Sequence, residues 1–269
     1  MSQTELSPDH SGGIVYEPEW GAGVARILIN RPHRRNALRR VDCEALLDRL
    51  REAERTSSVG CLVIMGAGDA FCAGADLHEM GSEDPEVRDR LIHAWTTMLY
   101  AILGSELVVI AGVAGPAVGG GHHLHLAADI SIAREDAKFK HSGLDMGGSP
   151  LELGTYILPL VVGLKRAKAL VFRPRLFSAR DALEWGLCAE VVPADTFAAT
   201  VREWAEAIAA AEPMARRLAK AQLNQAAHVA TANGRVAVLA GLLQSGTASA
   251  HKLIASHHES LGQPRRRAE

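Results

Sequence analysis

Aromatic residues are scarce in this chain of 269 amino acids, since Phe, Trp and Tyr together make up 4% of it. Surfaces that bind single-stranded nucleic acid stack bases on several aromatic rings, so this composition disfavours such a surface. Neither sign of charge is in excess, because 29 Lys and Arg face 31 Asp and Glu, and the formal net charge is −2. Proteins that neutralise a phosphate backbone usually carry a basic total. We therefore expect no nucleic-acid partner.

Cysteine and long apolar runs are also lacking. The four cysteines contain no CxxC pair, which disfavours both a thiolate zinc site and a disulfide scaffold. Residues 1–13 are polar, and no stretch approaches the ~18 uninterrupted apolar residues of a membrane-spanning helix. We expect a cytoplasmic protein that is neither secreted nor embedded in a membrane.

Short apolar runs alternate with amphipathic segments over the first half of the chain. The runs predict strands at 14–18, 24–30, 61–65, 107–113 and 130–133, the first two forming a hairpin. Helical spacing of apolar residues predicts helices at 41–55 and 87–102. This alternation indicates an α/β fold with buried strands.

After residue 150 the sequence is typical of helix. The predicted helices are 156–171, 179–185, 194–211, 213–228 and 236–255. We divide the chain into a disordered tail (1–13), an α/β core (14–195), a helical region (196–258) and a charged tail (259–269). The helical region suits packing against the core or against a second subunit.

Two glycine-rich loops each follow a predicted strand: residues 70–77 (AFCAGADL) and residues 115–124 (GPAVGGGHHL). Small residues let a ligand approach the backbone, and the start of a following helix offers N–H groups that favour negative charge. Two such N–H groups aimed at one point make an oxyanion hole. The alternative is that the glycines serve only the turns. Neither loop has the spacing of a nucleotide-phosphate loop.

Several motifs agree in order and spacing with one enzyme family. They are NRP (30–32), RNAL (35–38), FCAGADLHEM (71–80), AGPAVGGGHHLHLAADISIA (114–133), AKF (137–139), ALEWGL (182–187) and VVP (191–193). In these segments the chain resembles the crotonase superfamily, the enoyl-CoA hydratase/isomerase family. The resemblance implies a spiral of ββα units with a C-terminal helical trimerisation region. It also implies a homotrimer or hexamer, and an acyl-CoA thioester as substrate with no further cofactor.

The resemblance also implies the carbonyl-binding residues. The backbone N–H groups of Ala75 and Gly120 are expected to polarise the thioester carbonyl and to stabilise an enolate. Residues Ala73, Asp76 and Leu77 match the segment that contacts the adenine and pantetheine arm in relatives.

The phosphates of coenzyme A are expected to meet a basic turn. Arg34 and Arg35, beside Ala37, carry guanidinium groups suited to phosphate. The alternative is that this turn is only a solvated basic surface.

The acid–base residues depart from the family pattern. Hydratases of this family add water with two glutamates, and His123 and Gly143 occupy those positions here. His123 is one candidate replacement, because imidazole titrates near neutrality; the alternative is a hydrogen-bonded pocket residue. Asp145 and Glu152 are the candidate carboxylates, and Glu152 is preferred. We expect hydration of crotonyl-CoA to be very slow or absent.

Histidine is grouped near the second glycine loop, at His122, His123, His125 and His141. On a helix His122 and His125 share a face whereas His123 points elsewhere, and no thiolate or HExxH spacing accompanies them. We expect no metal site.

The predicted function is that of an enzyme, a lyase or isomerase of fatty acid metabolism. Two alternatives stay open. One is a noncatalytic acyl-CoA-binding protein, and the other is a CoA-thioester hydrolase or carbon–carbon lyase that uses His123, Asp145 or Glu152. The enzymes differ from the noncatalytic binding protein in whether one of these side chains reaches the acyl carbons of the bound thioester.

Overall fold

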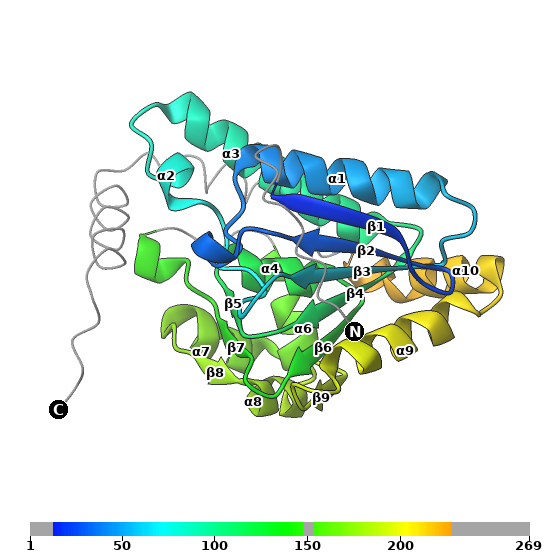
Figure 1. The fold of residues 1–269 in the computed structure, drawn as a ribbon. Helices are drawn as coiled ribbons and strands as arrows, with labels where there is room; N and C mark the ends of the chain where they lie inside the picture. The colour runs from blue at the N-terminus through cyan, green and yellow to red at the C-terminus, as the bar shows by residue number, and fades with distance from the viewer. Residues whose placement is uncertain (1–12, 148–152, 228–269) are drawn as a thin grey trace.

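The computed structural model describes residues 13–147 and 153–227 (Figure 1). Within them, a six-stranded sheet has the order β1-β2-β3-β4-β6-β9. Its strands are β1 (Ile14–Gly21), β2 (Val24–Ile29), β3 (Cys61–Gly66), β4 (Val108–Val113), β6 (Ile130–Arg134) and β9 (Glu190–Val192). The first two form an antiparallel hairpin and the other neighbours are parallel. The predicted hairpin and strands are confirmed.

A second sheet of three short strands, in the order β5-β7-β8, lies beside the first. Its strands are β5 (Pro116–Val118), β7 (Lys138–Lys140) and β8 (Phe177–Ser178). Strand β4 is followed by β5 and the helix α4 (Gly120–Ala127), and β6 is followed by β7. The pairs β4–β5 and β6–β7 therefore each give one strand to each sheet, in keeping with the predicted ββα units, whereas β1 and β2 both belong to the larger sheet.

Helices cover both faces of the larger sheet (Figure 1). One face carries α1 (Arg40–Arg55) and α3 (Pro85–Gly104), and the other carries α9 (Phe197–Ala209). Alternate residues of β3 serve the two cores, so that Leu62 packs on the side of α1 and Val63 on the side of α9. Because both faces of β3 are buried, its sequence is a continuous apolar run.

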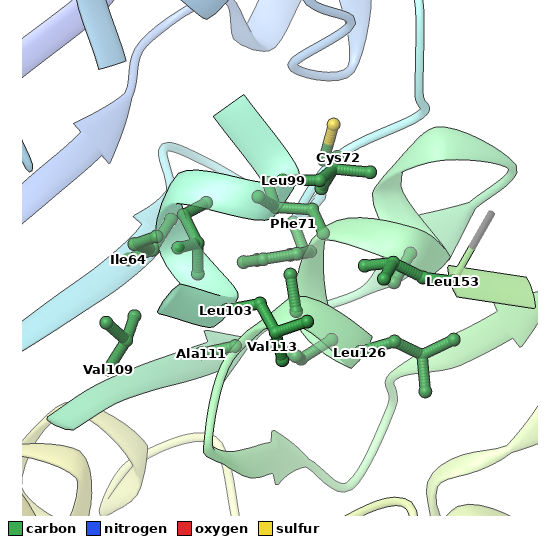
Figure 2. Close-up of a cluster of buried hydrophobic side chains, with 14 of the residues drawn as sticks. Ile64, Phe71, Cys72, Leu99, Leu103, Val109, Ala111, Val113, Leu126 and Leu153 are labelled. Atoms are coloured by element: carbon green, nitrogen blue, oxygen red, sulfur yellow. The ribbon is translucent and has the colours of Figure 1, made fainter. Parts of the chain in front are cut away.

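The core on the side of α1 and α3 continues under the first glycine loop. Phe71 and Cys72 of that loop belong to the same buried cluster as Leu99 and Leu103 of α3 (Figure 2). All four side chains are almost completely inaccessible to solvent. The loop is therefore anchored by apolar packing rather than held only by its ends.

The remaining helices are short. They are α2 (Leu77–Met80), α5 (Leu153–Tyr156), α6 (Leu158–Val162), α7 (Leu164–Phe172), α8 (Ala179–Glu184) and α10 (Pro213–Leu223), with 3-10 turns η1 (Pro32–Arg34) and η2 (Leu144–Met146). The prediction of one helix at 156–171 is wrong: α6 ends at Gly163, whose φ of +76° no helix can continue through. The predicted helix 236–255 lies outside the described residues.

All four cysteines are buried and free. None of the helices in the described ranges combines the length and apolar character needed to cross a membrane.

Candidate active site at the glycine loops

The two glycine-rich loops lie against each other where β3 and β4 end. Cys72 N donates a hydrogen bond to Pro116 O at 3.1 Å, and Val118 N donates to Cys72 O at 3.0 Å. Gly74, with a φ of +101°, approaches α4 so closely that a methyl group on it would lie 2.9 Å from Gly120 N. These contacts hold the backbone of the first loop beside the first turn of α4.

Ala75 and Gly120 keep their N–H groups unbonded within the part of the chain that the structure describes. Ala75 forms a parallel bridge with Leu38. In this bridge Leu38 N donates to Gly74 O and Asp76 N donates to Leu38 O, at 2.8 Å each. The bridge uses the neighbours of Ala75 and leaves its own N–H on the opposite side. Gly120 is the first residue of α4, where an N–H has no partner within the helix.

Trp95, on α3, explains why position 120 is glycine. A methyl group on Gly120 would overlap the indole ring of Trp95, which is itself buried. In the sequence, Trp95 is one of several apolar residues at helical spacing, so its place beside the second loop was not predicted.

A buried arginine ties the first loop to the rest of the core. The Arg31 guanidinium lies 3.2 Å from Asp76 Oδ2 and 3.5 Å from Asp42 Oδ2, and it donates to Ala37 O. Asp76 Oδ1 also accepts from His78 N at 3.0 Å and so caps α2. The Asp76 carboxylate is thus engaged inside the protein.

The other predicted contacts with coenzyme A lie around the same loop. Arg34 and Arg35 are exposed, whereas Ala37, Ala73 and Leu77 are half-buried. Ala73 N donates to Arg35 O at 3.0 Å, which joins the basic turn to the glycine loop. The structure therefore brings these predicted residues together on one side of the molecule.

His123 and His141 meet beside the second loop. Their Nε2 atoms lie 3.1 Å apart, and both residues are buried. Burial lowers the pKa of His141 to about 4 and that of His123 well below its usual value, so both rings are neutral at pH 7. Two neutral rings in this contact must be different tautomers, since one Nε2 donates and the other accepts.

His122 and His125 form a second buried pair, with His122 Nδ1 and His125 Nε2 separated by 2.8 Å. His125 Nδ1 lies 3.1 Å from Ser131 Oγ, and burial lowers the pKa of His125 to about 3. The prediction that His123 points away from these two rings is confirmed. Within residues 13–147 and 153–227, no group of three His, Cys, Asp or Glu side chains is placed to hold a metal ion.

The candidate carboxylates are differently placed. Gly143 precedes η2 and offers no side chain, and Asp145 forms an ion pair with Lys140. Glu152 lies outside the described residues, so its predicted role is neither confirmed nor contradicted. His123 is the candidate that the structure places on the same helix as Gly120, one turn further along.

A groove of about 840 Å³ lies away from the glycine loops. Its lining includes Val108 and Ile130, at the amino ends of β4 and β6, together with residues of α9 and α10. Because the glycine loops follow the carboxyl ends of β3 and β4, the groove belongs to the opposite edge of the sheet.

Known proteins share both the sequence and the fold. The family model described as "Enoyl-CoA hydratase/isomerase" matches residues 19–260. The 1,2-epoxyphenylacetyl-CoA isomerase of Escherichia coli (strain K12) is 32% identical over 208 residues, which cover 76% of this chain and 79% of that protein. The crystal structure of an enoyl-CoA hydratase/isomerase from Xanthobacter autotrophicus Py2 is 30% identical, with a TM-score of 0.83 over 92% of this chain and 93% of that one. That of an enoyl-CoA hydratase from Mycobacterium avium subsp. paratuberculosis K-10 is 25% identical, with a TM-score of 0.83 over 93% and 100%. The chain therefore belongs to the enoyl-CoA hydratase/isomerase family of the crotonase superfamily.

Proposed function

We propose that this protein is an enzyme that binds an acyl-CoA thioester with its carbonyl oxygen between the N–H groups of Ala75 and Gly120. The observation that carries the proposal is the pair of unbonded N–H groups on two loops in contact. When a proton leaves the carbon next to the carbonyl, negative charge develops on the oxygen. Each fixed donor stabilises that charge by ~2.7–4 kcal/mol.

The coenzyme A portion of the substrate extends along the first loop in this proposal. The guanidinium groups of Arg34 and Arg35 bind phosphate, and the backbone around Ala37, Ala73 and Leu77 follows the pantetheine arm. The exposure of the two arginines supports this role, because a phosphate can reach them without displacing packed side chains.

The proposed reaction is an isomerisation through an enolate. Hydration by a pair of carboxylates has no basis here, since His123 and Gly143 stand at those positions. An isomerisation moves a proton within one substrate and does not require water to be activated. The E. coli relative is named 1,2-epoxyphenylacetyl-CoA isomerase, which favours isomerisation over hydration.

The carbonyl stretching frequency of bound phenylacetyl-CoA, labelled with ¹³C at the thioester carbon, tests the proposal. We expect calorimetry to detect binding and infrared spectroscopy to show the band at a lower frequency than in solution. Ala75→Pro removes one N–H and is expected to reverse much of this shift, whereas Ala75→Gly keeps the N–H and the shift. The same preparation is expected to hydrate crotonyl-CoA very slowly or not at all. If the wild type binds neither phenylacetyl-CoA nor crotonyl-CoA, or binds with an unshifted carbonyl band, the proposal is wrong.

A further inference from the structure

The His123–His141 contact stands directly beside the carbonyl-binding loops. His123 follows Gly120 by three residues on α4, so the two positions share a helical face. Gly119 N donates to Lys140 O at 2.9 Å, which places the residue after Lys140 alongside the start of the same helix. The first turn of α4 therefore positions the imidazole of His123, and the pairing of β7 with β5 positions that of His141.

Gly154 lies close to the two imidazoles and restricts the space around them. A methyl group on Gly154 would lie 2.9 Å from His123 Nε2 and would overlap the imidazole of His141. Glycine at this position lets the two Nε2 atoms face each other with no third group between them. Within the described chain, His141 Nδ1 is buried and has no hydrogen-bond partner.

We infer that His123 and His141 together form the acid–base group of the enzyme, with His123 exchanging a proton with the substrate carbon next to the carbonyl and His141 positioning it. This inference rests on the proposed function, because it requires a thioester bound at Ala75 and Gly120. His123 is a catalytic residue in this scheme. His141 acts through His123 and is a positioning residue.

The proton transfer balances as follows for the tautomer in which His123 Nε2–H donates to His141 Nε2. The substrate C–H bond breaks, its proton moves to His123 Nδ1, and its electron pair becomes the enolate, with the charge on the oxygen between the two N–H groups. The imidazolium of His123 then makes a charge-assisted hydrogen bond to His141. Return of the proton to the same carbon restores the substrate, and its delivery to another carbon completes an isomerisation.

Neutral partners suit this step. Burial makes an isolated imidazolium costly at this place, but the enolate forms at the same moment and carries the opposite charge. The ion pair of the His123 imidazolium and the enolate forms and disappears within one catalytic cycle. The site without substrate therefore buries no net charge. A carboxylate in place of His141 would leave a negative charge beside the enolate.

The experiment measures deuterium incorporation at the α-carbon of phenylacetyl-CoA in D₂O, by NMR, together with its binding by calorimetry. We expect His123→Gln to slow the exchange by ~100-fold or more, the lower range for a lost general base. We expect affinity to change by less than about threefold. His122→Gln is the matched control, a buried histidine of the same helix outside the pair, and is expected to exchange at nearly the wild-type rate.

Two further experiments, on three variants, separate a catalytic pair from a merely structural one. His141→Gln retains a carbonyl that can accept from His123 Nε2, so it is expected to keep more activity than His141→Leu. Added imidazole is expected to restore part of the exchange to His123→Gly. A structural role alone would give neither result.

The outcomes distinguish the two proposals. Binding with a shifted carbonyl band but without α-carbon exchange, or with exchange undiminished in His123→Gln, overturns the role of the pair and leaves the proposed function standing. Absence of binding overturns both. If the histidine variants do not fold, ¹⁵N NMR of the wild type decides: a coupling across the Nε2–Nε2 hydrogen bond and a change of the His123 Nδ1 signal on binding are expected, and an unchanged Nδ1 signal overturns the inference.

Discussion

At the scale of single residues, the lack of a side chain at Gly154 allows the imidazoles of His123 and His141 to approach each other. We predict that Gly154→Ala separates His123 Nε2 from His141 Nε2, because the added methyl group overlaps the second ring. The α-carbon exchange of phenylacetyl-CoA is expected to fall by ~10-fold or more with its affinity nearly unchanged. Gly104→Ala is the control, since a methyl group there meets no atom within 4 Å. Equal exchange rates in the two variants would contradict this explanation.

The parts of the site that a local pattern indicates are the two loops, because their glycines follow apolar strands in the sequence. The choice of Ala75 and Gly120 as carbonyl-binding residues came from the family resemblance, and their role stays a prediction. His141 is 18 residues from His123, and their contact depends on the pairing of β5 with β7. No spacing rule along one chain indicates that register, and the same applies to the approach of Gly154.

At the scale of elements, α10 is joined to the sheet by an ion pair between a buried lysine and a partly buried aspartate. Lys220 Nζ lies 2.8 Å from Asp129 Oδ2 and donates to Leu107 O at 2.6 Å. Asp129 also accepts from Val109 N at 2.7 Å, so its carboxylate serves both β4 and α10. Burial raises the pKa of Asp129 although Lys220 opposes the shift, which indicates how costly this charge would be without its partner.

We predict that Lys220→Met lowers the free energy of unfolding by about 1–3 kcal/mol at pH 7, because it leaves the partly buried Asp129 carboxylate without its cationic partner. Urea denaturation followed by circular dichroism measures the change. The double variant Lys220→Met/Asp129→Asn is expected to recover part of the loss, since it removes the charge as well. A double variant less stable than Lys220→Met would show that the pair is not the cause.

Elements of different length were predictable to different degrees. Strands β3 and β4 are buried on both faces and α1 and α3 are long and amphipathic, so their apolar patterns identify them. Strands β5, β8 and β9 have two or three residues, too few to show a period. The single helix predicted at 156–171 is wrong because the apolar spacing continues through Gly163, although the helical backbone is interrupted there.

For the whole molecule, the buried histidines predict a loss of stability in mild acid. His125 and His141 have pKa values near 3 and 4 in the folded state, below the unfolded value of 6.5. Their contribution is complete above pH 6.5 and declines as the pH falls toward those values, since the unfolded chain binds protons that the folded chain does not. Each contributes ~1.4 kcal/mol per pH unit in this range.

The measurement is the urea midpoint between pH 7.5 and 5, where ordinary carboxylates stay ionised. His125→Asn removes one such group, so its stability is expected to depend less steeply on pH than that of the wild type. A midpoint independent of pH over this range would mean that the histidines take up protons as readily in the folded protein as in the unfolded chain.

The surface of the whole molecule predicts an oligomer. Large apolar side chains that are more than half exposed occur on α6, α7, α10 and the loop before β8: Leu160, Leu164, Phe172, Leu176, Met214, Leu218 and Leu223. Exposed apolar side chains in such number are typical of subunit contacts in soluble proteins. We expect a trimer or hexamer in sedimentation velocity at micromolar concentration. A stable monomer would contradict this prediction, and the cytoplasmic location likewise stays a prediction.

The groups proposed to donate hydrogen bonds to the substrate carbonyl are main-chain N–H groups. This has a consequence for how such a protein diverges in evolution. Exchange of one side chain for another leaves a peptide N–H in place, except where proline enters. Proton-transferring groups, in contrast, disappear with a single codon change. A lineage with this fold can therefore lose one reaction and acquire another while it continues to bind the same thioester. Selection then acts on a few side chains around main-chain N–H groups that are inherited unchanged.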